Sequence, residues 1–142
     1  GIRSRFVGSN IVGPFVVSSG VRSNVTYEST SLIKEILENY GKNFNENDLE
    51  VTKGYMLKSG ARAFETLDSK LIMLTNISNY GYPDDYAKQN EAIVKALTVE
   101  EIQDLAKKYI HPDKMIYLIV GDAATQLNKL ENLGFGKPVL LN

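Results

Sequence analysis

The residue types that most often carry catalysis are scarce in this chain. It has no cysteine and one histidine, His111. The lack of cysteine excludes disulfide frameworks, thiol nucleophiles and thiolate zinc sites. His111 precedes Pro112 where a helix is expected to end, and a histidine there most often caps the last carbonyl groups. A zinc site built from paired histidines is excluded because the chain has no second histidine.

Two short motifs imitate known sites. Residues 31–34 fit the S-x-x-K motif of penicillin-binding enzymes, but the chain has neither the S-D-N nor the K-T-G motif that completes such a site. Asparagines at positions 43, 45 and 47 have the spacing of a calcium-binding loop, but Asp48 stands where a glycine is required and Gly54 where a glutamate is required. We interpret the first match as chance and the asparagines as helix-capping residues.

Charged and polar side chains also group along the sequence. We expect most of the acidic group to serve helix N-termini; its members are Asp84, Asp85, Glu91, Glu100, Glu101 and Asp104. Ser59, Arg62 and Glu65 have the spacing of a solvated helix face. The sequence therefore assigns no catalytic, cofactor-binding or metal-binding residue, and the substrate-binding residues are unknown.

The composition is that of a globular domain. Of the 142 residues, 43% are hydrophobic, and a chain of this length can fold as a single domain, residues 1–142, without a metal or disulfide. With 16 basic and 17 acidic residues the chain lacks the positive field that gathers nucleic acid. The longest apolar run, residues 115–120, is far shorter than the roughly 20 residues that cross a bilayer, so we expect no transmembrane segment.

The first half of the chain predicts a hairpin followed by two helices. Residues 2–22 have strand composition interrupted by turn residues, which indicates two paired strands. A helical period begins at Thr26, and Gly41 stands where a left-handed C-cap residue is favoured. Asn47 followed by Glu50 is typical of a helix start. The apolar stripe after it predicts one long helix to about Asn79, with a bend near Gly60.

The second half predicts further helices and the central strand of a sheet. Thr98 and Glu101 have the spacing of a capping box, before a helix that ends at His111. The continuous apolar run at residues 115–120 is expected in the middle of the sheet. A short helix to Gly134 and a last strand at residues 138–141 complete the pattern. The fold class predicted is α+β, with a mostly antiparallel sheet and helices packed on one face.

Five segments in order resemble the C-terminal, non-catalytic domain of the insulinase/pitrilysin family of zinc metallopeptidases, most closely the bacterial zinc-protease type. The segments are DLEVTK at residues 48–53, YGYPDDY at 80–86, TVEEI at 98–102, AKKYIHPD at 106–113 and LIVGD at 118–122. The hairpin at residues 4–22 also resembles strands of that domain. The resemblance covers nearly the whole chain and implies the half-domain fold of that family, with N-terminal elements absent.

The resemblance implies a binding role without catalysis. Active members carry H-x-x-E-H, with two histidines on zinc and a glutamate as base, and this chain has no such motif. It implies that zinc is held by a partner catalytic domain, in the same parent chain or in a second subunit, and that this chain forms one wall of a chamber around unfolded peptide. The family's substrate-holding Arg and Tyr are not assigned to any residue here.

Several alternatives stay open from sequence. A catalytically dead scaffold or docking subunit, like the core or processing-peptidase-like subunits of respiratory complexes, has the same pattern. An enzyme with an unrecognised carboxylate site is a third reading. Because the chain begins with Gly1 and runs directly into a strand pattern, we expect a fragment of a longer protein. The resemblance favours a bacterial periplasm or cell envelope, with cytoplasm as the alternative.

Overall fold

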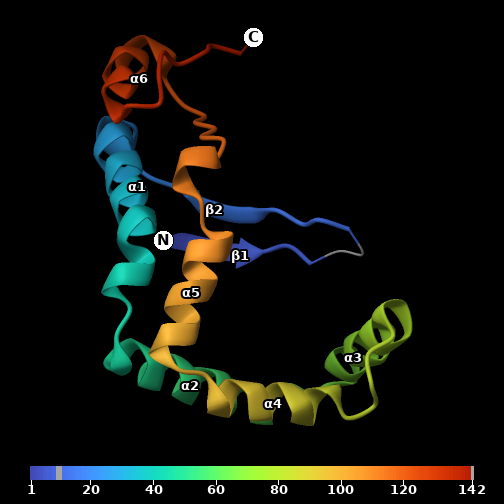
Figure 1. The fold of residues 1–142 in the computed structure, drawn as a ribbon. Coiled ribbons are helices and arrows are strands. Elements are labelled where there is room, and N and C mark those ends of the chain that lie inside the picture. The colour runs from blue at the N-terminus through green and yellow to red at the C-terminus, as the bar shows by residue number, and fades with distance from the viewer. Residues whose placement is uncertain (9–10, 142) are drawn as a thin grey trace. The chain divides into compact units, whose positions relative to one another are not determined.

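The computed structural model describes residues 1–8 and 11–141 (Figure 1). Helices make up most of these residues, and the two described strands form one antiparallel sheet. The elements are β1 (Ile2–Phe6), β2 (Phe15–Ser19), η1 (Ser23–Val25), α1 (Thr26–Asn43), α2 (Glu46–Ala61), α3 (Leu67–Tyr80), α4 (Tyr86–Ala96), α5 (Val99–Tyr109), η2 (Pro112–Lys114), α6 (Ala123–Leu130) and η3 (Glu131–Leu133). The fold is therefore mixed α and β, and mainly helical.

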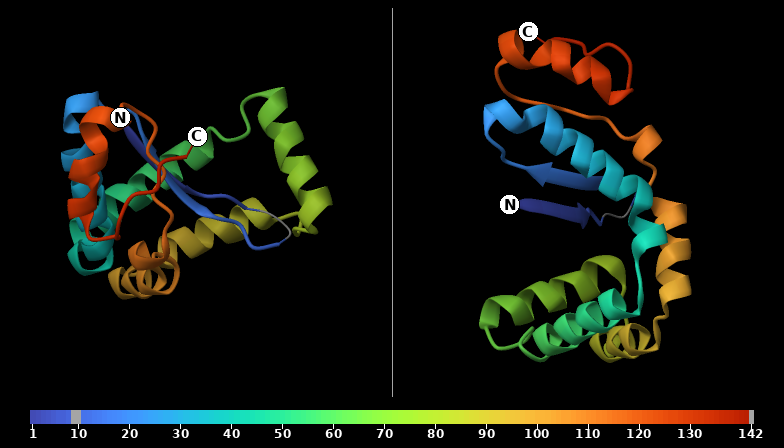
Figure 2. Two further views of the ribbon diagram at one scale, coloured as in Figure 1. Left: turned by 90° about the horizontal axis from the view of Figure 1, so that it is seen from above. Right: turned by 90° about the vertical axis from the view of Figure 1, so that its left-hand side faces the viewer.

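The predicted N-terminal hairpin is confirmed. Ile2 lies opposite Ser19 and Phe6 opposite Phe15 in an antiparallel register (Figures 1 and 2). The prediction that residues 115–120 form the middle strand of the sheet was wrong for the described residues, where the sheet contains β1 and β2 alone. The last strand expected at residues 138–141 is likewise not formed. An apolar run is compatible with a strand, but a strand also requires a hydrogen-bonding neighbour.

The predicted long helix is divided into α2 and α3. Arg62 follows α2, and its amide N–H donates to the carbonyls of Ser59 and Gly60. Thr66 then starts α3 through a capping box with Ser69, in which each side chain accepts a hydrogen bond from the other residue's amide. The apolar stripe crosses the break without interruption, so periodicity alone predicted one helix. The local capping chemistry was the overlooked signal.

Two capping predictions differ from the structure. The N-cap of α2 is Asn45, not Asn47, because the Asn45 side chain accepts from the amides of Asn47 and Asp48. Gly41 is not a C-cap, since α1 continues to Asn43 and Gly41 has no positive φ. Gly41 instead permits a close approach: a Cβ there would lie 3.2 Å from the Cβ of Ala106.

Other sequence signals for helix ends are confirmed. The hydroxyl of Thr98 accepts from the amide of Glu101 at 3.2 Å, and the Glu101 carboxylate accepts from the Thr98 amide at 2.9 Å. This is the capping box expected before α5. Gly134, with φ of 81°, ends the short C-terminal helical segment at the expected position. The Asp122 carboxylate caps α6 by accepting from the amide of Ala124.

Contacts within the chain divide it into two compact units. Unit 1 comprises the described residues of 1–40 and 107–141, and unit 2 comprises residues 41–106. The single domain expected from length stays a prediction. Along the described ranges, no helix has the length and apolar character needed to span a membrane.

Aromatic contacts hold unit 1 together at two places. Phe6 of β1 lies 4.7 Å from Phe15 of β2, measured between ring centroids, and meets Tyr109 edge-on at 6.4 Å. At the other place Tyr117 and Phe135 stack with centroids 4.0 Å apart. Leu133 is buried, and its carbonyl accepts from the ammonium of Lys34, which also lies over the Phe135 ring. The hairpin and the C-terminal segment are thus anchored by different aromatic groups.

Contacts within unit 2 join α2 to α4, and α5 to the loop before α2. Among the side chains that the structure describes in this unit, the buried ones are those of Phe44, Leu49, Val94 and Ala106. The side-chain amide of Gln103 donates to the carbonyl of Phe44 at 3.0 Å, and the ammonium of Lys53 donates to the carbonyl of Lys95 at 2.9 Å. The first bond ties α5 to the loop before α2, and the second ties α2 to α4.

Candidate functional site

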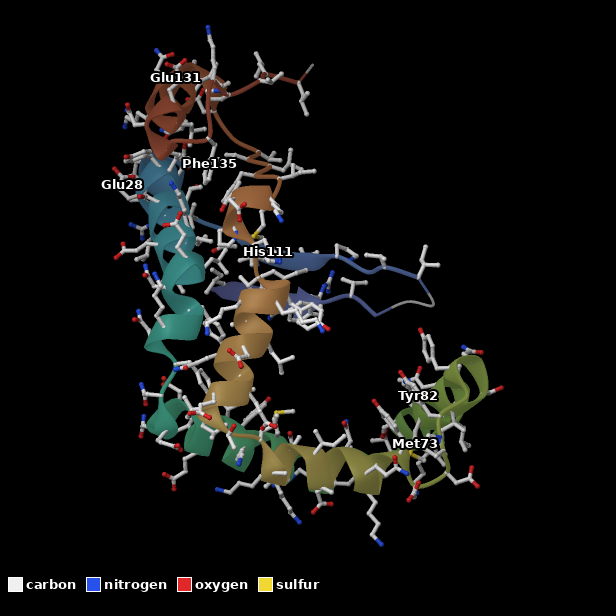
Figure 3. The ribbon with its side chains drawn as sticks, in the orientation of Figure 1. Glu28, Met73, Tyr82, His111, Glu131 and Phe135 are labelled. Atoms are coloured by element: carbon white, nitrogen blue, oxygen red, sulfur yellow. The ribbon has the colours of Figure 1, made fainter. Side chains whose placement is uncertain are left out.

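His111 acts as a helix-end residue. Its ring Nε2 lies 2.9 Å from the carbonyl oxygen of Lys108 in the last turn of α5 (Figure 3). A carbonyl oxygen only accepts, so the ring nitrogen is the donor. The predicted capping role of His111 is confirmed by this bond.

The described residues form no candidate metal site. Over the described ranges, no three or more His, Cys, Asp and Glu side chains come together in a way that could hold a metal. Members of the acidic group have local partners instead: Asp85 accepts from Gln89, Glu91 from Lys95 and Glu101 from the Thr98 amide. The hydrogen bond from Lys95, together with its charge, lowers the pKa of the exposed Glu91 carboxyl.

Ser59, Arg62 and Glu65, which were expected to share one helix face, do not lie on the same helix. Ser59 lies near the end of α2, where its hydroxyl donates to the Met56 carbonyl at 3.1 Å. Arg62 and Glu65 lie in the turn between α2 and α3. The i, i+3, i+6 spacing therefore does not give a shared helix face, because the helix ends at Ala61.

The lysine of the S-x-x-K match is part of a structural cluster. The ammonium of Lys34 donates to the Leu133 carbonyl at 2.9 Å and lies 4.7 Å from the centre of the Phe135 ring. It is also 3.8 Å from the Glu38 carboxylate. Figure 3 shows Phe135 beside the N-terminal part of α1. Lys34 thus joins α1 to the C-terminal turn, which is a positioning role and not that of a catalytic base.

Tyr117 also belongs to the cluster formed by Lys34, Leu133 and Phe135. It was not identified from the sequence. Its ring stacks on Phe135, and its hydroxyl donates to the Pro112 carbonyl at 3.3 Å. Partial burial, and secondly the negative charge of Glu38, raise the pKa of the Tyr117 hydroxyl. The alternation of burial along residues 115–120 places Tyr117 on the packed side, and only a structure reveals which side that is.

The raised Tyr117 pKa predicts a loss of stability at alkaline pH. An unfolded tyrosine titrates near pH 10. Above that pH the unfolded chain releases the proton while the folded chain retains it, so unfolding becomes more favourable until the folded group also titrates. Urea unfolding at pH 9 and pH 11 should show a larger loss of stability in the wild type than in Tyr117→Phe. Equal losses in the two proteins would contradict the assignment.

The described surface most suited to binding an extended ligand is the open edge of β1. All five residues of β1 are exposed, and β2 pairs with only one of its edges. Arg3 and Arg5 lie on one face of the strand, because alternate residues share a face. Both guanidinium groups are exposed, and neither forms an ion pair with another described residue.

This edge can bind a partner in two ways. Its unpaired backbone groups can bond to an added strand. Its two arginines can pair with carboxylates on that strand. Comparison with known proteins identifies no relative: no family model, curated protein or solved structure matches the chain.

Proposed function

We propose that this chain is a non-catalytic, peptide-holding domain of a zinc-metallopeptidase-like protein. It would form one wall of a chamber, opposite a catalytic domain that supplies zinc and the general base. That domain would belong to the same parent protein or to a second subunit. The proposal includes the finer fold of the resemblance, an α+β half-domain with a larger antiparallel sheet and helices on one face.

The observation that carries the proposal is the open β1 edge. Peptide-binding domains commonly hold an extended peptide by adding it to a sheet edge, where main-chain hydrogen bonds supply affinity and side chains supply preference. β1 is exposed along its whole length, and one of its edges has no strand partner among the described residues. Arg3 and Arg5 would favour peptides with acidic residues at alternate positions. The ordered resemblance supports the same role.

The experiment measures binding of a defined extended peptide by fluorescence anisotropy. The probe is a fluorescein-labelled eight-residue peptide of alternating valine and glutamate. Two derivatives carry N-methyl groups on alternate residues, one on the valines and one on the glutamates. Strand addition uses the amides on one edge of the peptide, so one derivative should bind and the other should not. Equal binding of both derivatives would contradict strand addition.

Protein variants test the contribution of the arginines. Arg3→Glu combined with Arg5→Glu should weaken binding about tenfold, because each cross-strand charge pair contributes roughly 0.2–1 kcal/mol and becomes repulsive. Arg22→Glu combined with Lys129→Glu, both outside β1 and β2, makes the same total change of charge and is the matched control. The parent protein's zinc content should be the same in both variants. No binding by the wild type would overturn the proposal and favour the scaffold alternative.

A further inference from the structure

Residues 115–120 have the side-chain pattern of a strand but no strand partner among the described residues. Met115, Tyr117 and Ile119 are half-buried, whereas the alternate residues are exposed: Ile116 is 93%, Leu118 73% and Val120 92% exposed. Alternation with a period of two is the pattern of an extended strand with one packed face. The other face is a row of three apolar side chains in solvent.

The backbone of residues 116–120 is also unpaired in the part of the chain that the structure describes. The amide of Met115 donates to the Pro112 carbonyl, but no backbone hydrogen bond joins residues 116–120 to any other described residue. Unpaired strand edges that carry apolar side chains readily pair with another chain. This segment lies in unit 1 and is separate from the β1 edge considered above.

We propose that two copies of this chain pair antiparallel through residues 115–121, with Leu118 opposite Leu118. In this register Ile116 lies opposite Val120. Lys114, the last residue of η2, and Asp122, the N-cap of α6, flank the paired segment and meet across the pair at each end. The exposed rows of both copies then lie side by side on one sheet face, where cross-strand apolar pairs stabilise the sheet.

Symmetry restricts the register. In a two-fold dimer the axis is perpendicular to the sheet, so a residue and its counterpart point to the same face. Opposite residues of the pair also point to the same face. Because side chains alternate along a strand, two opposite residues must then be an even number of positions apart in the sequence. The residue midway between them therefore lies opposite its own copy at the axis. The centre must therefore be a residue, such as Tyr117, Leu118 or Ile119, and not a point between two residues.

Charge complementarity selects Leu118 from these centres. Centring on Tyr117 places Lys114 opposite Val120, and centring on Ile119 places Asp122 opposite Ile116. Only the Leu118 register pairs Lys114 with Asp122, and by symmetry it does so at both ends. Both side chains are exposed.

Asp122 retains its role at α6 in this dimer. One carboxylate oxygen accepts from the amide of Ala124 at 3.0 Å, and the other accepts from the hydroxyl of Thr125 at 2.8 Å. A carboxylate has about four acceptor positions, so Asp122 can also accept from Lys114 of the second copy.

Single-cysteine variants test the register directly, since the wild type has no cysteine. Opposite residues of an antiparallel pair have Cα atoms about 4.5–5.5 Å apart, which lies within the range of a disulfide. Leu118→Cys should therefore form a covalent dimer under mild oxidation. Ile116→Cys should not, because its two copies would lie about 13 Å apart along the strands. A mixture of Ile116→Cys and Val120→Cys should give the mixed dimer.

Sedimentation of the wild type and a charge-reversal variant completes the test. The wild type should sediment as a dimer with twice the mass of the 15.8 kDa chain. The dimer should dissociate more readily as the salt concentration rises. Lys114→Glu should raise the dimer dissociation constant about tenfold, because two attractive pairs become repulsive. Lys129→Glu on α6 is the control. Equal oxidation of Ile116→Cys and Leu118→Cys, or a wild type that stays monomeric, would overturn the proposal. If the protein is monomeric but residues 115–120 bind an added peptide, this edge pairs with a strand of another protein and the dimer proposal is wrong.

Discussion

Replacing Phe44 with alanine should lower the free energy of unfolding by about 3–5 kcal/mol, the usual range for deleting a buried phenylalanine. Phe44 is 8% exposed in the loop between α1 and α2. Its removal leaves a cavity in a unit whose other buried side chains, among those described, are Leu49, Val94 and Ala106. Because folded domains are stable by about 5–15 kcal/mol, this variant should lose much of its stability. Urea unfolding followed by circular dichroism measures the change.

The control for Phe44→Ala is an exposed aromatic residue in the same unit. Tyr55 of α2 is 74% exposed, so Tyr55→Ala removes a ring of similar size without opening a cavity. Alanine is also the better helix former, and the free energy of unfolding should change by less than about 0.5 kcal/mol. Similar losses in the two variants would show that Phe44 is not part of a packed core.

Leu133→Ala is the second large effect expected, a loss of about 2–5 kcal/mol. Leu133 is 6% exposed at the end of η3. The bond from Lys34 goes to its backbone carbonyl, which the substitution keeps. The loss therefore measures side-chain packing separately from the Lys34 hydrogen bond.

Leu140→Ala is the matched control for Leu133→Ala, since Leu140 is 59% exposed in the same unit. Its free energy of unfolding should change by no more than about 0.5 kcal/mol. If Leu140→Ala were as destabilising as Leu133→Ala, the C-terminal segment would have to pack differently from the described structure.

Signals confined to one turn of the chain were the most predictable. The capping box of Thr98 and Glu101, the C-terminal glycine Gly134 and the hairpin were all correct, because each depends on residues close in sequence. The Asn45 capping box was misplaced by two residues, since neighbouring asparagines and acidic residues offer competing boxes. Local chemistry thus located these helix ends correctly or to within two residues.

The arrangement of distant segments was less predictable. The apolar run at residues 115–120 indicates a strand, but nothing in the run itself specifies the neighbour that would pair with it. Gly41 was interpreted from its place after a helical period, whereas the close approach of Ala106 depends on a residue 65 positions away (106 minus 41). Both errors concern tertiary contacts that periodicity does not contain.

Little of the candidate site could be predicted from the sequence, which left the substrate-binding residues unknown. The sequence excluded thiol and histidine-pair chemistry, and His111 proved to cap α5 as expected. It did not single out the contacts of Lys34 with Leu133 and Phe135, because these join residues about a hundred positions apart. The exposed edge of β1 could be identified only from the structure, which shows how the two strands of the hairpin pair.

The close approach of Gly41 to Ala106 has a topological consequence. These residues are the first and last of unit 2, and a Cβ on Gly41 would lie 3.2 Å from that of Ala106. The chain therefore enters and leaves unit 2 at the same point, as an inserted module does. Adjacent ends are the arrangement that tolerates insertion and circular permutation in other proteins. Residue 41 lies within α1 and residue 106 within α5, so these two helices carry the chain into and out of unit 2.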